Sequence, residues 1–238
     1  MKGKSKQSYF GKDLEDMAFA ENYHRWIINR FKPYLGNNVA EIGAGSGNFT
    51  SFLVNEKIKR IFAFEPSDNM FSLLKNKFKE KKEVIAINSF LSEKYQEFPE
   101  FFDSVLYVNV LEHIKSDQKE LDFAYKTIKK NGFILIFVPA LPWLYSNFDK
   151  KVGHFRRYSK KNLTEVVRKS GFSVKHISYF DSVGVILWYI VFVLLGKTTS
   201  RTNVSLYDKL IIPPMKFLES LIEPPIGKNL IVIGQKKQ

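Results

Sequence analysis

Cysteine is absent from this chain of 238 residues, and that absence sets the first limits on its chemistry. Without thiols the chain can form no disulfide bond, no thiolate metal site and no iron–sulfur cluster. Every mechanism that depends on a cysteine nucleophile is excluded as well. The lack of cysteine fits a protein of the cytoplasm.

Long hydrophobic runs are scarce too. Residues 1–16 carry positive charge but no apolar segment, so we expect no secretory signal peptide. Residues 183–196, VGVILWYIVFVLLG, are almost wholly apolar. At about 1.5 Å per residue, however, such a helix is shorter than the roughly 30 Å hydrocarbon core of a bilayer. Two interpretations stay open: a buried core helix or dimer contact, and an interfacial helix with Trp188 and Tyr189 at the level of the lipid headgroups.

Acidic residues are few relative to basic ones. The 24 Asp and Glu stand against 37 Lys and Arg, which gives a net charge of +13. Such a balance favours anionic partners: nucleic acid, phosphorylated metabolites or an acidic membrane surface. The hydrophobic fraction of 45% and the charged fraction of 26% are those of a globular chain large enough to bury a substantial core.

The hydrophobic pattern predicts strands that alternate with helices. A helical segment at residues 13–35 precedes apolar strands at residues 38–43, 60–66, 83–88, 102–111, 132–140, 172–180 and 229–237. Helices are expected at residues 49–55, 69–79, 117–129 and 163–170. This alternation is typical of an α/β fold with a doubly wound, mostly parallel sheet, here of seven strands.

Four parts of the chain follow from this pattern. We expect an N-terminal helical cap (1–36), an α/β core (37–180), a helical insertion (181–228) and a final core strand (229–238). The second half of the insertion has helical spacing that Pro213 and Pro214 interrupt. The insertion is expected to act as a substrate cap, a dimer contact or a membrane contact.

Residues 40–50, AEIGAGSGNFT, place three glycines at alternate positions behind the first predicted strand. A glycine turn between a strand and a helix brings backbone N–H groups close to a nucleotide, because glycine tolerates the dihedral angles that the turn needs. The stretch lacks the Gly-Lys-Ser/Thr ending of a P-loop. Asn48 also takes the place of the last glycine in the dinucleotide pattern G-x-G-x-x-G, so a nicotinamide-dependent oxidoreductase is a weaker alternative.

EIGAGSG resembles the first motif of the class I S-adenosylmethionine-dependent methyltransferases, an acidic residue followed by Gly-x-Gly-x-Gly. Glu65 ends the second predicted strand, where that family places a carboxylate on both ribose hydroxyls; one carboxylate can accept both donors of a diol. FDSVLYVNVLEHI (102–114) is similar to the family's fourth strand and the loop after it. The resemblance covers roughly residues 20–180 and the last strand, and it implies a Rossmann-like methyltransferase fold.

The resemblance implies S-adenosylmethionine as cofactor and S-adenosylhomocysteine as product. The implied cofactor-binding residues lie in the glycine turn, at the ends of the next strands and in the N-terminal helix: Glu41, Gly43, Ala44, Gly45, Gly47, Glu65, Pro66, Ser89, Asn109, Val110 and Tyr23. Many relatives carry an acidic residue after the third strand, at the adenine; here Asn88 or Ser89 must replace it. We expect His113 to cap and pack rather than catalyse. The sequence shows no metal-ligand spacing, so no metal is predicted.

The segment after the fifth predicted strand, PALPWLYSNFDKKVGHFRRYSKKNL (139–163), is dense in reactive side chains. Ligands of such sheets lie outside the carboxyl ends of the strands, so this segment is placed to meet a substrate. It resembles the D…GH-x-RRY segment of a bacterial methyltransferase subgroup associated with glycan, lipid and secondary-metabolite pathways.

Candidate roles follow from the chemistry of methyl transfer. A hydroxyl acceptor must lose a proton, and His154 is the best candidate for the base, with Asp149 orienting its imidazole and Tyr158 as a further catalytic candidate. The predicted substrate-binding residues are two guanidinium groups that can grip a phosphate or carboxylate and two aromatic rings beside them: Arg156, Arg157, Trp143 and Tyr145. Structural roles are also open, since Ser159 can cap a basic helix and one arginine can pair with Asp149.

We therefore predict a methyltransferase that acts by in-line transfer on a small-molecule acceptor, anionic or linked to a glycan or lipid. It is expected in the cytoplasm or at the cytoplasmic face of an acidic membrane. RNA or protein methylation and a non-catalytic binding subunit are the alternatives. Nucleic acid is less favoured, because the fourth strand ends in VNVL rather than in an Asn/Asp-Pro-Pro-aromatic motif and no RNA-binding module is apparent. The acceptor atom and the oligomeric state are not determined.

Overall fold

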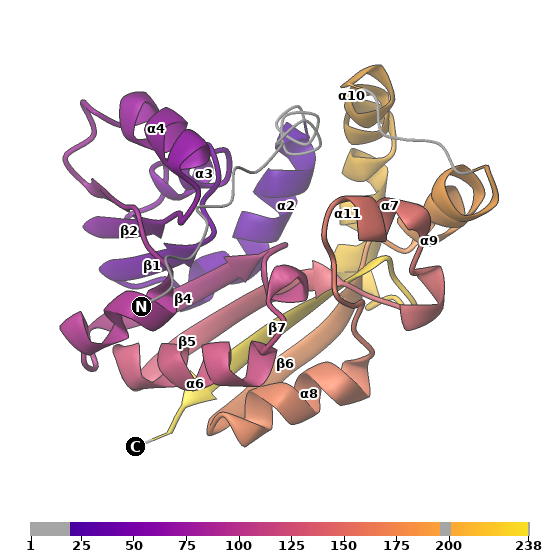
Figure 1. Ribbon diagram of the computed structural model, residues 1–238. Coiled ribbons are helices and arrows are strands. Elements are labelled where there is room, and N and C mark those ends of the chain that lie inside the picture. The colour runs from indigo at the N-terminus through magenta and orange to yellow at the C-terminus, as the bar shows by residue number, and fades with distance from the viewer. Residues whose placement is uncertain (1–19, 196–200, 238) are drawn as a thin grey trace.

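A seven-stranded sheet forms the centre of the protein in the computed structural model, which describes residues 20–195 and 201–237 (Figure 1). Its strands are β1 (Asn38–Ile42), β2 (Arg60–Phe64), β3 (Val84–Ile87), β4 (Phe102–Val108), β5 (Ile128–Pro139), β6 (Phe172–Phe180) and β7 (Asn229–Lys236). Their order is β3-β2-β1-β4-β5-β7-β6. The first five pair in parallel, and β7 runs antiparallel to both of its neighbours. The predicted α/β fold with a mostly parallel seven-stranded sheet is confirmed.

Both faces of the sheet are buried, which explains why its central strands read as continuous apolar runs. In β5 the side chains of Ile134 and Ile136 enter the core on one face, and those of Leu135 and Phe137 enter the core on the other. Strand ends differ from the apolar pattern by a few residues. The strand predicted to reach residue 111 stops at Val108, because Asn109 takes a left-handed backbone conformation (φ 53°).

Two layers of helices cover the sheet. On one face lie α5 (Leu91–Lys94), α6 (Asp117–Thr127) and α8 (Lys160–Lys169), whose apolar residues join the same core as the strands. On the other face lie α2 (Glu21–Phe31), α3 (Thr50–Leu53), α4 (Asp68–Lys77), α10 (Arg201–Leu210) and α11 (Ile212–Leu221). Figure 1 shows α6 and α8 on the near side of the sheet and α2 and α3 beyond it.

Shorter elements connect these layers. They are η1 (Lys32–Tyr34), η2 (Tyr95–Glu97), η3 (Leu111–His113), η4 (Pro142–Leu144) and α7 (Asn147–Lys151). The helix predicted over residues 13–35 is helical from Glu21 to Phe31 and continues as η1; residues 13–19 lie outside the described residues. Trp26 from α2 stacks on Phe180 with ring centroids 3.8 Å apart, so it belongs to the core.

The segment between β6 and β7 is mostly helical where it is described, and residues 222–228 lead from its last helix into β7 without regular structure. It contains α9 (Val183–Trp188), the π-helical η5 (Tyr189–Leu194), α10 and α11. The predicted interruption falls at Ile211: Pro213 and Pro214 stand at the start of α11, where a missing backbone N–H costs no helical hydrogen bond. Among the described residues, no helix combines the length and the hydropathy that crossing a bilayer requires.

Candidate active site

The glycine turn after β1 needs glycine for two physical reasons. Gly43, Gly45 and Gly47 have φ angles of 69°, 58° and 81°, in the left-handed region that side chains disfavour. Space is the second reason: a Cβ on Gly43 would lie 2.7 Å from a methyl carbon of Val110, and one on Gly47 would lie 2.4 Å from the ring of Phe78. Val110 and Phe78 therefore pack directly against the backbone of the turn, and Gly43 and Gly45 line a cavity.

Two carboxylates hold this turn. Glu65, at the end of β2, accepts a hydrogen bond of 2.8 Å from the backbone N–H of Gly45 and another of 2.8 Å from that of Ser67. The side chain of Ser67 donates a third hydrogen bond to this carboxylate, which leaves about one of its four lone-pair sites for a further donor. Glu41 accepts a hydrogen bond of 2.6 Å from the Thr50 hydroxyl, and burial raises the pKa of Glu41 to about 8. At neutral pH most of the Glu41 carboxyl is therefore protonated.

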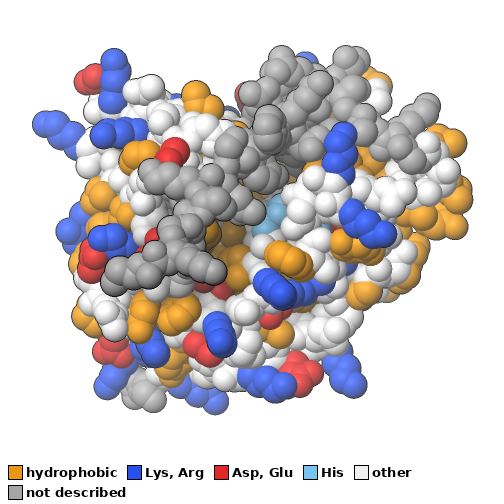
Figure 2. All heavy atoms as spheres, in the orientation of Figure 1, with side chains coloured by type: hydrophobic (Ala, Val, Ile, Leu, Met, Phe, Trp, Pro, Cys, Tyr) orange, Lys and Arg blue, Asp and Glu red, His pale blue; other side chains and the backbone are white. Residues whose placement is uncertain are grey.

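A cavity extends from the glycine turn across the carboxyl ends of β1 and β4 to the loop that follows α7. One end is lined by residues predicted to bind the cofactor: Tyr23, Glu41, Gly43, Ala44, Gly45 and Asn109. The other end is lined by Glu112, His113, Phe148, His154, Arg157 and Trp188. Figure 2 shows a hollow in this face of the molecule with a histidine side chain inside it. Predicted cofactor-binding residues and the predicted base thus share one cavity.

Five predicted cofactor-binding residues surround this cavity without lining it: Gly47, Glu65, Pro66, Ser89 and Val110. Ser89 donates a hydrogen bond of 2.9 Å to the carboxylate of Glu93, and the side-chain amide of Asn88 donates to the backbone carbonyl of Glu65. Their contacts with a cofactor stay predictions. Tyr23 faces the cavity, and its hydroxyl donates a hydrogen bond of 3.0 Å to the side chain of Asn229.

Asp149 organises the opposite end of the cavity. Its carboxylate is fully buried and accepts hydrogen bonds from the backbone N–H and hydroxyl of Ser146 at 2.8 and 2.9 Å, which fixes the start of α7. The same carboxylate accepts from Nδ1 of His154 and from Nε of Arg157, each at 2.9 Å. Burial alone would raise the pKa of Asp149, but the hydrogen bond from His154 and the charge of Arg157 outweigh burial and lower it. The geometry is the one predicted for an imidazole oriented by Asp149.

The two arginines of the RRY stretch have different surroundings. Arg157 is buried against Asp149, with its guanidinium carbon 4.4 Å from the ring centroid of Trp188. Arg156 donates to the backbone carbonyls of Ile114 and Lys115 and forms an ion pair of 2.7 Å with Asp117. Arg156 does not line the cavity. The predicted pairing of one arginine with Asp149 is therefore made by Arg157.

Tyr158 also lies outside the cavity. Its hydroxyl donates a hydrogen bond of 2.8 Å to Asp117, and its side chain is 2% exposed. The backbone of Tyr158 pairs with Ala140, so the chain is extended there and alternate side chains point to opposite sides. This alternation turns Arg156 and Tyr158 toward Asp117 and turns Arg157 toward the cavity, which removes the first two from reach of an acceptor there.

The aromatic wall consists of other rings than those predicted. Trp143 is 57% exposed and contacts Tyr189, and the hydroxyl of Tyr145 donates a hydrogen bond of 2.6 Å to the backbone carbonyl of His154; neither lines the cavity. Phe148 and Trp188 line it instead, with ring centroids 5.5 Å apart. Of the two interpretations of residues 183–196, the interfacial one placed Trp188 at the level of the lipid headgroups; its ring instead lines the cavity, and its indole N–H donates to the carbonyl of Leu144.

Comparison with known sequences assigns the chain to a family. A family model described as a methyltransferase domain matches residues 16–177, well over half of the chain. The chain belongs to this methyltransferase family. It is similar to the tRNA U34 carboxymethyltransferase of Helicobacter pylori, with 23% identity over 116 residues, 47% of this chain and 44% of that enzyme. The match thus spans less than half the length of that relative.

Solved structures share the fold along nearly the whole chain. An S-adenosylmethionine-dependent methyltransferase of Archaeoglobus fulgidus superposes with a TM-score of 0.63 at 20% identity, covering 94% of this chain and 99% of that one. Phosphoethanolamine N-methyltransferase 2 of Haemonchus contortus, solved with S-adenosyl-L-methionine, gives a TM-score of 0.65 at 20% identity, covering 95% of this chain and 58% of that one. S-adenosylmethionine is the cofactor of this methyltransferase domain. The turn fits it, because Gly43 and Gly45 line the cavity without side chains and the Glu65 carboxylate is hydrogen-bonded to the backbone of Gly45.

Sequence reasoning missed several residues that line the cavity of the methyltransferase. Glu112 is fully buried beneath His154, and burial raises its pKa to about 7. His113, expected only to cap and pack, also lines the cavity; burial, with the charge of His154 as a second cause, lowers its pKa to about 4. The sequence LEH (111–113) is part of the resemblance to the family's fourth strand and following loop, but no pattern in it indicates that the carboxylate of Glu112 is buried at the cavity.

His24 is another missed residue of this wall, and it makes the methyltransferase sensitive to acid. It packs against Phe49 and Phe52, its Nδ1 has no hydrogen-bond partner among the described residues, and burial lowers its pKa to about 4. Between pH 6.5 and about pH 4, His24 therefore binds a proton in the unfolded chain but stays neutral in the folded chain. The free energy of unfolding is unaffected by this proton above pH 6.5, and it falls by about 3 kcal/mol as the pH is lowered to 4.

Urea unfolding at several pH values measures this effect. Between pH 7 and pH 4, the free energy of unfolding of the His24→Leu variant is expected to fall by about 3 kcal/mol less than that of the wild type. Parallel profiles for the wild type and His24→Leu would contradict the assignment.

Proposed function

We propose that this protein transfers a methyl group to a hydroxyl oxygen of an anionic, glycan-type acceptor that is carried by a lipid. S-adenosylmethionine, when bound, supplies the electrophilic methyl group. One observation carries the lipid part of the proposal: the helix that provides Trp188 to the cavity wall exposes a row of apolar side chains on its outer side. A lipid surface that covers this row would bring a membrane-bound acceptor to the cavity.

The exposed row, here called the α9–η5 patch, is formed by Ile186, Leu187, Tyr189, Ile190, Leu194 and Leu195. Ile186 and Leu194 are each 62% exposed, which is unusual for side chains of this kind in a folded protein. Trp143 continues the patch through its contact with Tyr189. Figure 2 shows hydrophobic side chains gathered on the right of the view, over α9. A contiguous apolar surface of this kind is typical of a membrane or protein contact.

Charge favours an anionic bilayer as the partner of the patch. The sequence from Ser182 to Tyr207 contains no acidic residue, although it contains two basic ones. The whole chain carries a net charge of +13. Basic charge close to an apolar surface stabilises binding to the negative cytoplasmic leaflet by about 1 kcal/mol for each Lys or Arg near the surface.

The chemistry at the inner end of the cavity suits a hydroxyl. Asp149 holds Nδ1 of His154, so the proton of this neutral imidazole sits on Nδ1 and Nε2 is free to take the proton of an acceptor. Arg157 and Lys228 line the same cavity; Arg157 is paired with Asp149 and Lys228 with Asp181, and a phosphate or carboxylate on the acceptor would be a further partner for each cation. Phe148 and Trp188 exclude water from the site, which strengthens these interactions.

Binding to vesicles tests the membrane contact. We expect the wild type to sediment with vesicles of mixed anionic and neutral phospholipid, and the variant Ile186→Ser/Ile190→Ser/Leu194→Ser to bind them at least 10-fold more weakly. The matched control Leu206→Ser/Leu210→Ser/Leu221→Ser removes three apolar side chains elsewhere in the insertion whose mean exposure is somewhat higher, and it should bind like the wild type. Equal losses in both variants, or no binding by the wild type, would contradict the proposed contact.

Transfer of a labelled methyl group tests the acceptor. Three acceptors are compared: an anionic glycolipid in vesicles, its free headgroup and a bulk transfer RNA fraction. All three are supplied at the same concentration of hydroxyl groups. We expect transfer to the glycolipid at least 10-fold faster than to the free headgroup, and a loss of that advantage in the patch variant. Faster transfer to RNA would overturn the proposal in favour of nucleic-acid methylation.

A further inference from the structure

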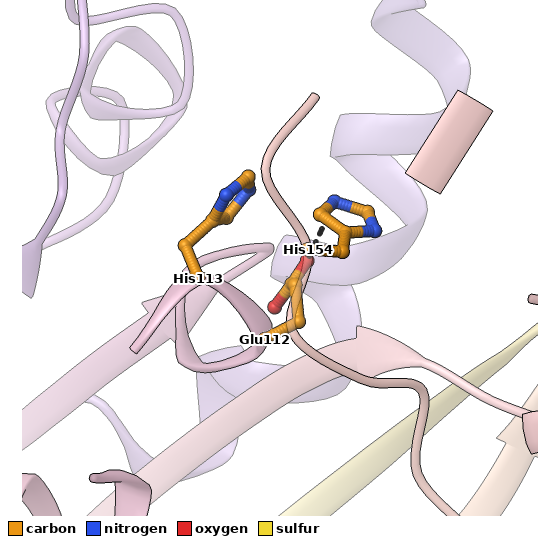
Figure 3. Close-up of side chains that lie close together, drawn as sticks. All are labelled: Glu112, His113 and His154. Atoms are coloured by element: carbon orange, nitrogen blue, oxygen red, sulfur yellow. Dashed lines mark ion pairs between the residues drawn. The ribbon is translucent and has the colours of Figure 1, made fainter. Parts of the chain in front are cut away.

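Three side chains with metal-binding chemistry meet at the inner end of the cavity. Glu112 and His113 belong to η3, directly after β4, and His154 comes from the loop after α7. One ligand atom from each lies within 4.8 Å of the other two. Figure 3 shows the three side chains close together, with the Glu112–His154 contact of 3.8 Å as a dashed line. Ligands about 2.1 Å from one cation are roughly 3 to 3.5 Å apart, so small side-chain rotations complete the set.

The Glu112 carboxylate is the observation that points to a ligand. Its side chain is 0% exposed, and neither oxygen accepts a hydrogen bond from another residue in the part of the chain that the structure describes. Burying a carboxylate without hydrogen bonds is costly, so such groups are ordinarily paired or coordinate a metal. Its neighbour at 3.8 Å, Nε2 of His154, is too far to be a hydrogen-bond partner. A cation between them would satisfy both groups.

The surroundings of the two histidines are those of metal ligands. Metal-binding imidazoles ordinarily use their second nitrogen to hydrogen-bond a carboxylate or a backbone carbonyl. Nδ1 of His154 is held by Asp149 at 2.9 Å, and Asp149 is held in turn by Arg157. The ring of His113 is hydrogen-bonded to the backbone of Gly153. These contacts fix the orientation of both rings.

We infer that Glu112, His113 and His154 form a binding site for one divalent transition-metal cation. Two imidazoles and one carboxylate suit Zn²⁺, Mn²⁺, Fe²⁺ or Co²⁺, whereas Mg²⁺ and Ca²⁺ prefer sites made of oxygen atoms. All three ligands line the cavity that contains the glycine turn. Three protein ligands leave at least one coordination position open, as in catalytic rather than structural metal sites.

The open position gives the cation a role toward the acceptor, and only this part of the inference rests on the proposed function. A hydroxyl oxygen bound to the cation would lose its proton more readily to a water molecule from solvent, because the positive charge would stabilise the alkoxide. In the cation-loaded protein Nε2 of His154 is a ligand. In the cation-free protein the same nitrogen takes the proton itself. The cation site itself depends only on the three side chains.

Titration with Co²⁺ tests the site without any acceptor. The purified full chain, freed of metal with a chelator, is expected to bind one equivalent of Co²⁺ with micromolar or tighter affinity and to develop visible absorption bands. The variants Glu112→Gln and His113→Gln, which keep nearly the same side-chain volume, should each bind at least 100-fold more weakly. His176→Gln changes a histidine outside the cavity and should bind like the wild type. Unchanged affinity for S-adenosylhomocysteine shows that each variant is folded.

The outcomes separate this inference from the proposed function. One-to-one binding that both cavity variants lose supports the site, even where no methyl transfer to a glycolipid is found. Wild-type protein that binds no Co²⁺ at a 1:1 ratio overturns the inference and leaves the proposed acceptor untouched. Equal Co²⁺ affinity in the wild type and Glu112→Gln overturns it as well.

Discussion

Replacing Asp149 by alanine is expected to destabilise the protein by about 4 kcal/mol and to abolish methyl transfer. Asp149 and Arg157 are both almost fully buried, and removal of one partner of such an ion pair ordinarily costs about 3 to 5 kcal/mol because the other charge stays buried and unpaired. The loss also leaves the N–H of Ser146 without its acceptor at the start of α7. His154 in turn loses the hydrogen bond that orients its ring.

A double variant separates the two consequences. In Asp149→Ala/Arg157→Leu neither member of this ion pair is left buried without the other, so we expect about half of the lost stability to return. Activity should not return, because the imidazole of His154 is still unoriented. Chemical denaturation and the rate of methyl transfer are measured for the wild type, both single variants and the double variant. A destabilisation below about 1 kcal/mol in Asp149→Ala, or full activity in the double variant, would show that the buried network does not have this role.

Replacing Glu65 by alanine is expected to weaken S-adenosylhomocysteine binding about 100-fold, or roughly 2.7 kcal/mol. Glu65 holds the N–H groups of Gly45 and Ser67 and accepts a hydrogen bond from the Ser67 side chain, and the family resemblance assigns the ribose hydroxyls to the same carboxylate. Hydrogen bonds to a charged group contribute about 1.5 to 3 kcal/mol each, so loss of the carboxylate accounts for the expected effect.

Matched variants show whether the Glu65 effect is specific. Glu65→Gln keeps one acceptor oxygen and should weaken binding only about 10-fold, or roughly 1.4 kcal/mol. Glu80 is an exposed carboxylate shortly after α4, and Glu80→Ala should bind like the wild type. Equal losses in Glu65→Ala and Glu80→Ala would mean that overall charge, not the position of the carboxylate, determines affinity.

Local patterns were sufficient for the sheet and for the glycine turn with the carboxylate beside it. The glycine turn could be predicted from the spacing of Gly43, Gly45 and Gly47, because the positive φ angles of all three and the close packing at Gly43 and Gly47 require glycine. The place of Glu65 beside this turn could be predicted because Glu65 comes directly after the next strand. The position of β7 between β5 and β6, antiparallel to both, follows from the return of the chain after the insertion, and no local pattern in the sequence indicates it.

The acceptor end could be predicted only in part. Arg156 and Arg157 are adjacent and chemically identical, and only the pairing of Tyr158 with Ala140 decides which of them turns toward the cavity. Trp188 lies in a stretch that is apolar all round, so periodicity could not show that its ring turns inward. Glu112 stands in a short motif after β4, and its burial depends on the loop from α7 that folds over it, a long-range contact.

The measurement that tests the account most directly is calorimetric titration of S-adenosylhomocysteine and of NAD into the wild-type protein and Glu65→Ala. The account predicts one S-adenosylhomocysteine site per chain with micromolar affinity, strong weakening in Glu65→Ala, and no heat from NAD. An absence of S-adenosylhomocysteine binding by the wild type, or NAD binding of equal strength, would contradict the assignment of this cavity to methyl transfer.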